Sequence, residues 1–179
     1  MLEKENTVLV IIDIQGKLAR IVHDSESVIG NARKLIQGAQ ILNIPILWME
    51  QTPLAIGPTV EEIAELLPTT KPFTKNSFSC CGNQDFMDAL ASLSRQQVLL
   101  IGIETHVCVN QTAIDLLDEE YDVYVAADAV SSRTLQNREI GLQKMRDEGA
   151  VLTSVETALF ELLRVAEGKE FRQILKIIK

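Results

Sequence analysis

The sequence contains a short run of apolar, mostly β-branched residues, Thr7–Ile12, that ends at the carboxylate of Asp13. Because this run has no polar face, we expect it to form a strand that is buried on both faces. Similar runs occur later in the chain, at 46–49, 97–103, 122–127 and 150–154. Amphipathic segments separate them, and strands that alternate with helices predict βαβ units with right-handed crossovers and a parallel sheet.

Apolar residues spaced three and four apart predict the helices between these strands. The expected helices cover 25–43, 60–67, 84–94, 105–120, 135–148, 156–165 and 169–178. The segment 50–79 is the least regular and holds four of the five prolines. Long irregular segments of this kind often carry function. No linker or repeat divides the sequence, so we expect residues 1–179 to form a single domain.

The charge and hydropathy of the chain exclude several classes of function. Its formal net charge is −8, whereas nucleic acids and anionic membranes attract basic surfaces. Its longest unbroken apolar run, Val8–Ile12, is far shorter than the about 20 residues of a membrane helix. The polar start, residues 1–6, does not resemble a signal peptide. We therefore expect a cytoplasmic protein that binds a small molecule, with neither nucleic acid nor a membrane as partner.

The three cysteines are Cys80, Cys81 and Cys108. Adjacent cysteines rarely pair with each other, because the disulfide would strain the ring that it closes. The odd number and the spacing do not suggest a disulfide framework.

Ligands of parallel sheets bind outside the carboxyl ends of the strands. Cys108 follows one such strand, and with Thr105 as the N-cap it is the third residue of the predicted helix. The helix dipole at this position would lower the pKa of the thiol and favour a nucleophilic thiolate. The same helix start could hold an oxyanion. The alternative is that Cys108 is a small buried hydrophobic residue, and position alone does not separate the two.

Two further charged residues are candidates for chemistry. Asp13, directly after its strand, could accept and return a proton, although a helix cap or an ion pair is the simpler alternative. Lys75 lies in the irregular segment and could hold a negative charge, although most lysines are solvated surface charges. Asp128 is expected to cap the turn that follows it.

Several signatures of other functions are missing. The chain has no Gly-x-Gly-x-x-Gly and no P-loop motif, which argues against nucleotide binding. Its two histidines, His23 and His106, form no cluster with metal-ligand spacing. We therefore expect neither a metal nor a cofactor.

Four segments, taken in order, resemble the isochorismatase-like cysteine hydrolase superfamily. They are Asp13-Ile-Gln15, the segment 71–78 around Lys75, the Gly-x-x-Thr-x-x-Cys-Val pattern at 102–109, and the segment 127–133. The order and spacing hold over about residues 6–165. Each segment alone is weak evidence, whereas the four in order are specific.

The resemblance implies a fold and a mechanism. The fold is a Rossmann-like three-layer α/β/α sandwich around a mostly parallel six-stranded sheet. This sheet has one strand more than the five that the apolar runs predict. The implied catalytic triad is Asp13, Lys75 and Cys108. The peptide bond between Ile103 and Glu104 is expected to be cis, with the N–H groups of Glu104 and Cys108 directed at one oxyanion. Cys108 would then attack a small amide or related carbonyl compound.

The resemblance also bears on the pocket, the metal and the assembly. Nicotinamidase members bind metal through histidines that the segment 48–54 lacks, which favours a metal-free site. Leu18, Trp48, Phe78 and His106 are the candidate pocket residues. The superfamily commonly forms homo-oligomers, dimers or larger. The apolar stretch 171–178 could contact a neighbouring subunit or pack on its own sheet.

Two other functions are also compatible with the sequence. One is a binding or scaffold protein that keeps the fold with an idle triad. The other is a thiol redox sensor, in which Cys80 or Cys81 would resolve an oxidised Cys108.

Overall fold

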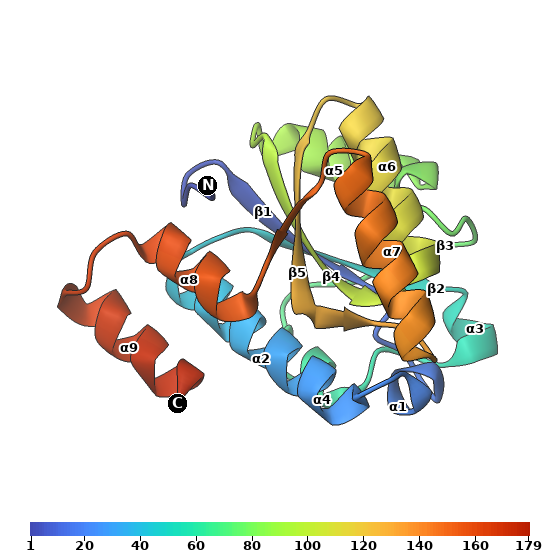
Figure 1. The fold of residues 1–179 in the computed structure, drawn as a ribbon, viewed down its shortest axis with the longest axis horizontal. Helices are drawn as coiled ribbons and strands as arrows, with labels where there is room; N and C mark the ends of the chain where they lie inside the picture. Colours follow the sequence, from blue (N-terminus) through green and yellow to red (C-terminus); the bar gives the residue numbers. More distant parts are fainter.

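Six parallel strands form one central sheet in the computed structural model, which describes residues 1–179 (Figure 1). The strands are β1 (Thr7–Ile12), β2 (Ile46–Gln51), β3 (Phe73–Lys75), β4 (Gln97–Ile103), β5 (Asp122–Ser131) and β6 (Val151–Thr153). Their order across the sheet is β3-β2-β1-β4-β5-β6. The predicted α/β architecture with a six-stranded sheet is thus confirmed. The sixth strand, which no apolar run predicted, is β3. It has only three residues and pairs with β2 at the sheet edge.

Helices connect these strands. They are α1 (Leu18–Ile21), α2 (Ser25–Ile41), α3 (Pro53–Ile56), α4 (Glu61–Ala64), α5 (Gln84–Ser92), α6 (Asn110–Asp118), α7 (Leu135–Asp147), α8 (Val155–Leu163) and α9 (Gly168–Ile178). The helix predicted at 60–67 is reduced to the single turn α4. The helix predicted at 105–120 begins with a π-helical turn, Thr105–Val109, before α6. None of the helices is both long enough and apolar enough to span a membrane.

Side chains of β1 alternate between two hydrophobic clusters. Leu9 and Ile11 pack with buried residues of α2 and α8, whereas Val8 and Val10 pack with buried residues of α5, α6 and α7. Successive side chains of a strand point to opposite faces of the sheet, so a strand that is apolar throughout needs cover on both sides. Figure 1 shows α2 and α8 on one side of the sheet and α6 and α7 on the other.

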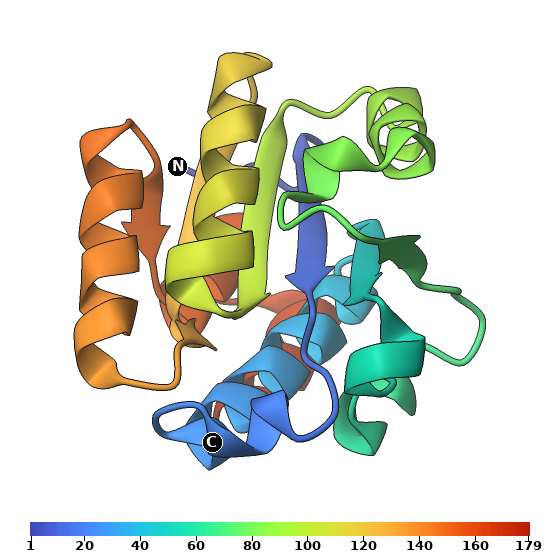
Figure 2. The same cartoon turned by 90° about the vertical axis from the view of Figure 1, so that its right-hand side faces the viewer.

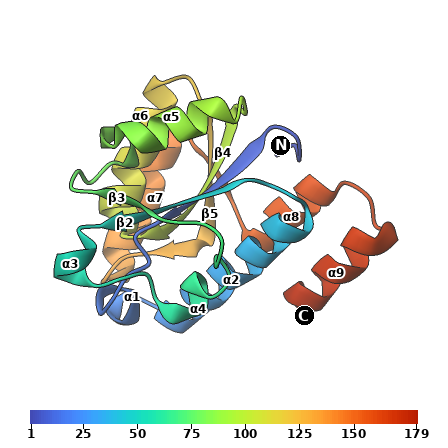
Figure 3. The same cartoon turned by 180° about the vertical axis from the view of Figure 1, so that it is seen from behind.

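The C-terminal helix α9 packs against α2 and α8 and lies at the outside of that layer (Figure 3). Ile174 is fully buried there, whereas Phe171, Ile177 and Ile178 are half-buried. The apolar stretch 171–178 therefore packs on its own chain, with α2 as its neighbour.

The strand β5 extends four residues beyond its predicted end, to Ser131. Its pairing with β4 shifts register, because several residues between Val125 and Val130 stand opposite the single residue Ile101. Asp128 lies in this irregular part, and its Oδ1 accepts a hydrogen bond of 2.9 Å from the N–H of Val155 at the start of α8. Asp128 thus stabilises a distant helix rather than the turn that follows it in sequence.

Candidate active site

A buried ion pair joins the ends of two strands. Nζ of Lys75 lies 2.6 Å from Oδ2 of Asp13, and the two side chains are 0% and 3% exposed. Lys75 is the last residue of β3, and Asp13 directly follows β1, with β2 between these strands. In Figure 2 the arrow of β1 points toward the segments that carry α1 and α3, which lie beyond this end of the sheet. Lys75 is therefore not a solvated surface charge.

Lys75 has further acceptors around its ammonium group. Nζ donates to Oε1 of Gln51 at 2.8 Å and to the backbone carbonyl oxygens of Ser77 and Phe78 at 3.3 and 3.0 Å. An ammonium group has three hydrogens, and Asp13 makes the fourth acceptor. These four acceptors, Asp13 among them, use the hydrogens of the Lys75 ammonium group.

Gln51, at the end of β2, is a site residue that the sequence pattern does not single out. Gln15 fixes its backbone: Oε1 of Gln15 accepts from the Gln51 N–H at 2.7 Å, and Nε2 donates to the carbonyl oxygens of Gln51 and Gly57 at 3.2 and 2.8 Å. The backbone of this loop also touches Gly16, where a Cβ would lie 2.0 Å from the carbonyl oxygen of Ile56. Gln15 therefore pins the loop after β2 onto the end of β1.

Cys108 lies in the π-helical turn after β4 and is 8% exposed. Burial and, next, the negative charge of Asp13 together raise the pKa of its thiol to about 12, while Lys75 opposes the shift. The helix-start argument predicted a lowered pKa, and this prediction is wrong because burial dominates. The predicted N-cap is also wrong, since Glu104 holds that position and the buried hydroxyl of Thr105 has no hydrogen-bond partner.

Asp13 is the polar group that faces this thiol. Burial raises the pKa of its carboxyl group, and the charge of Lys75 and hydrogen bonds from Lys75 and Cys108 oppose the shift. Oδ2 is occupied by Lys75, whereas the buried Oδ1 has no hydrogen-bond partner of good geometry. A buried acceptor without a partner is costly, so Oδ1 is available to a proton or to a donor of a bound molecule.

The residues before the π-helical turn have an unusual backbone. The peptide bond between Ile103 and Glu104 is cis. The side chain of Glu104 turns away toward Arg133, and its Oε1 accepts hydrogen bonds from the backbone N–H and from Nε of Arg133 at 2.9 and 3.1 Å.

A cavity of about 120 Å³ lies over Cys108. Its lining residues are Asp13, Leu18, Gln51, Ile56, Phe78, Ile103, Glu104, Val107 and Cys108. Of the predicted pocket residues, Leu18 and Phe78 are in this lining and Trp48 and His106 are not. Trp48 is buried in the cluster beside α2, and Nδ1 of His106 lies 2.9 Å from Oγ of Ser132.

The π-helical turn is held from behind by α7. A Cβ at Gly141 of α7 would lie 2.8 Å from both N and Cα of His106. No side chain larger than hydrogen fits at this contact. Gly141 thus lets α7 support the backbone that carries Cys108.

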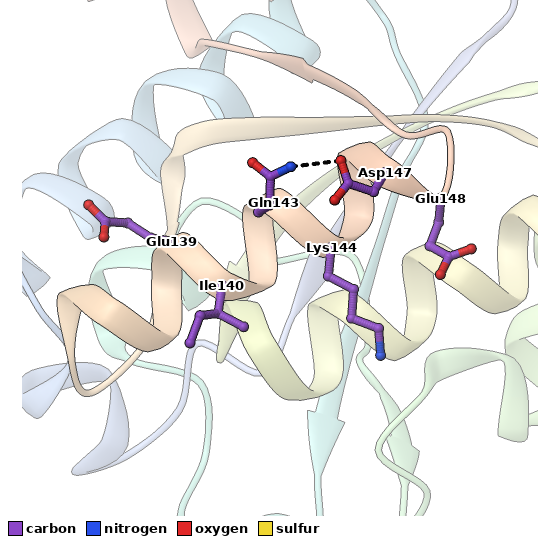
Figure 4. Close-up of a pocket in the computed structure, with 6 residues that line it drawn as sticks. All are labelled: Glu139, Ile140, Gln143, Lys144, Asp147 and Glu148. Carbon is purple, nitrogen blue, oxygen red and sulfur yellow. Dashed lines mark hydrogen bonds between the residues drawn. The ribbon is translucent and has the colours of Figure 1, made fainter.

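A larger hollow, of about 560 Å³, lies elsewhere on the surface along α7 (Figure 4). It is lined by residues of α7 and the residue that follows it, which are Glu139, Ile140, Gln143, Lys144, Asp147 and Glu148. It includes no residue that follows a strand of the sheet, so we place the candidate site at the smaller cavity. No group of three or more His, Cys, Asp or Glu side chains is placed to hold a metal ion.

Known proteins share this fold along nearly the whole chain. The MAR1 ribonuclease from Caenorhabditis elegans superposes with a TM-score of 0.93 at 36% identity, covering 99% of this chain and 91% of that one. YcaC from Pseudomonas aeruginosa, solved with hexane-2,5-diol and covalent acrylamide, superposes with a TM-score of 0.91 at 26% identity, covering 98% and 90%.

Sequence comparison points to the same group. A secreted isochorismatase effector from Phytophthora sojae is 40% identical over 178 residues, which cover 97% of this chain and 85% of that protein. The family model for the isochorismatase domain matches residues 7–157. This range contains all the strands of the sheet and the residues around the cavity. The chain therefore belongs to the isochorismatase family.

Proposed function

We propose that the protein is a cysteine hydrolase that cleaves a small amide or a related carbonyl compound, with Asp13, Lys75 and Cys108 as its catalytic triad. One observation carries the proposal. A buried Asp13–Lys75 ion pair and a buried thiol, from three strand ends, meet at one small cavity. Cavities at this edge of a parallel sheet are the usual place for ligands.

The raised pKa of Cys108 decides how the first step runs. With a pKa of about 12 the group is a thiol at neutral pH, so its proton must leave as the sulfur attacks. Asp13 accepts this proton while Sγ forms a bond to the carbonyl carbon of the substrate. Burial raises the pKa of Asp13, which makes its carboxylate a stronger base than an exposed one. Lys75 keeps the carboxylate oriented and does not touch the substrate.

The remaining steps transfer the proton to the leaving group and regenerate the free enzyme. The backbone N–H groups of Glu104 and Cys108 stabilise the oxyanion of the tetrahedral intermediate. Asp13 gives its proton to the leaving nitrogen as the carbon–nitrogen bond breaks, which leaves a thioester on Cys108. Water then attacks the thioester, with Asp13 as the base, and releases the acid and the free thiol.

Two observations support a small substrate for this chain. The cavity has a volume of only about 120 Å³, and the related YcaC, at 26% identity, holds covalent acrylamide, a small amide. A ribonuclease activity, for which the Caenorhabditis elegans relative is named, is not favoured here. RNA is a polyanion, and this chain carries a formal net charge of −8.

The environment of the other thiols does not favour a redox sensor. Burial raises the pKa of both Cys80 and Cys81, and for Cys81 the value is about 11. Oxidation proceeds through the thiolate, which these surroundings suppress. Non-reducing peptide mapping after peroxide treatment is expected to show no disulfide between Cys108 and either residue.

Turnover of a panel of small amides, esters and vinyl ethers tests the proposal. We expect Cys108→Ala to abolish hydrolysis and Cys81→Ala, a matched change of a half-buried thiol outside the cavity, to preserve it. In the native protein, iodoacetamide should label Cys108 faster than Cys80 or Cys81, because only Cys108 has Asp13 beside it to accept the thiol proton as the sulfur attacks. Saturable binding of panel compounds without turnover would support the scaffold function instead.

A further inference from the structure

The size and the lining of the cavity limit what the proposed reaction accepts. Its volume of about 120 Å³ is close to that of an apolar protein cavity of about 150 Å³ that binds benzene. Six of its nine lining residues are hydrophobic. They are Leu18, Ile56, Phe78, Ile103, Val107 and Cys108. A group that enters this space exchanges part of its water shell for hydrocarbon.

No cation is available to a bound molecule inside the cavity. No lysine, arginine or histidine is among the lining residues. The nearest ammonium, Lys75, already has four acceptors within 3.3 Å. Arg133, which is not among the lining residues, donates its Nε and its backbone N–H to Glu104. A carboxylate in the cavity would lose its hydration without a counter-ion, which is strongly unfavourable.

The charged groups that do line the cavity are both acidic. They are Asp13 and Glu104, and Glu104 is satisfied by Arg133. Oδ1 of Asp13 is buried and has no hydrogen-bond partner of good geometry, so it favours a donor such as an amide N–H. An anionic group would instead approach this oxygen against its charge.

Resting on the proposed function, we infer that the site accepts compact, uncharged amides and excludes substrates whose acyl group carries a carboxylate. The acyl group is bound by Leu18, Ile56, Phe78 and Val107, with the amide nitrogen near Oδ1 of Asp13. Selection is by charge and size together, because hydrophobic side chains form most of the lining and its two charged groups are both acidic.

Iodoacetamide and iodoacetate form a matched pair of probes, since they have nearly the same size and differ in charge. Each is reacted with the native protein and with urea-denatured protein, and the Cys108 peptide is quantified by mass spectrometry. The denatured chain supplies the intrinsic preference of the same thiol. We expect the native preference for iodoacetamide over iodoacetate to exceed the denatured preference by at least about tenfold.

The outcomes separate this inference from the proposed function. A smaller ratio, with Cys108 still labelled readily by iodoacetamide, overturns the charge selection and leaves the nucleophile standing. A native Cys108 that reacts with neither probe overturns the proposed function, and the inference with it.

A pair of variants adds an independent check. Leu18→Arg brings a cation to the half-buried lining and should raise the relative rate with iodoacetate several-fold. Ile21→Arg, on the same helix but 49% exposed and outside the lining, is the matched control and should leave the ratio unchanged. Equal responses of the two variants contradict an effect inside the cavity.

Discussion

Replacing Lys75 by methionine leaves a carboxylate buried without its partner. The Asp13–Lys75 pair is 2.6 Å long, and its side chains are 0% and 3% exposed, so solvent does not screen it. Breaking a buried pair at one side costs about 3–5 kcal/mol. We expect Lys75→Met to lower the free energy of unfolding at pH 7 by about this amount, whereas Lys17→Met, at an exposed lysine, should change it by less than about 0.5 kcal/mol.

The pH dependence of the stability of Lys75→Met identifies the unpaired carboxylate of Asp13 as the cause of the stability loss. Burial already raises the pKa of Asp13, and removing Lys75 removes an effect that lowers it, so the pKa in the folded variant rises further. The folded variant then binds a proton that the unfolded chain, with a carboxyl pKa of about 3.9, has released. Its stability falls as the pH rises above that value, by up to about 1.4 kcal/mol per pH unit. Lowering the pH from 7 to 5 should therefore narrow the stability difference between the variant and the native protein, by at most about 2.8 kcal/mol.

Urea unfolding, followed by circular dichroism at pH 5 and pH 7, measures both quantities. The double variant Asp13→Asn with Lys75→Met carries no titratable group at this position, so its stability difference from the native protein should change less between the two pH values than that of Lys75→Met. An equal loss for Lys75→Met at both pH values would refute the reasoning, because the cost would then lie in packing and not in the stranded carboxylate.

The site, its support and the assembly lead to three further predictions. Gly141→Ala places a Cβ 2.8 Å from backbone atoms of His106 and should cost about 1–3 kcal/mol of stability together with kcat. Gly30→Ala, with open space around its Cβ, should keep kcat and gain up to about 1 kcal/mol; matching kcat losses in the two variants would contradict the role of Gly141. The acid limb of kcat/KM should lie above pH 3.8, the ordinary pKa of Asp13, because the carboxyl group cannot accept the thiol proton below its raised pKa; a limb at or below 3.8 contradicts Asp13 as the base. Light scattering should give a multiple of the 19.9 kDa chain mass, and a mass of one chain contradicts the predicted homo-oligomer.

The sequence predicted the ends of β1 and β4 well because a strand buried on both faces is apolar along its whole length. Runs such as Thr7–Ile12 have no polar face, and the polar residue that ends each run marks the edge of the sheet. Asp13 and Cys108 were found in this way. The fold class followed from the alternation of these runs with helices, which is a property of the whole chain and tolerates errors at single residues.

The parts that the sequence did not predict depend on contacts between distant segments. β3 has three residues and exists through its pairing with β2, so it has no pattern of its own. Gln51 has no sequence pattern that distinguishes it from a loop residue, because its place in the site depends on hydrogen bonds with the distant residues Gln15 and Lys75. The sign of the Cys108 pKa shift was wrong because a position at a helix start says nothing about how deeply the thiol is buried.

The backbone contact between Gly16 and Ile56 limits how the shape of the cavity can change to accept new substrates. Because a Cβ at Gly16 would lie 2.0 Å from the carbonyl oxygen of Ile56, the two segments touch without any side chain between them. The cavity wall on this side cannot be drawn inward, and moving it outward would break the hydrogen bonds of Gln15. Directed evolution toward new substrates should therefore succeed through substitutions at Leu18, Phe78 and Val107, while loop insertions between residues 51 and 57 should yield inactive protein.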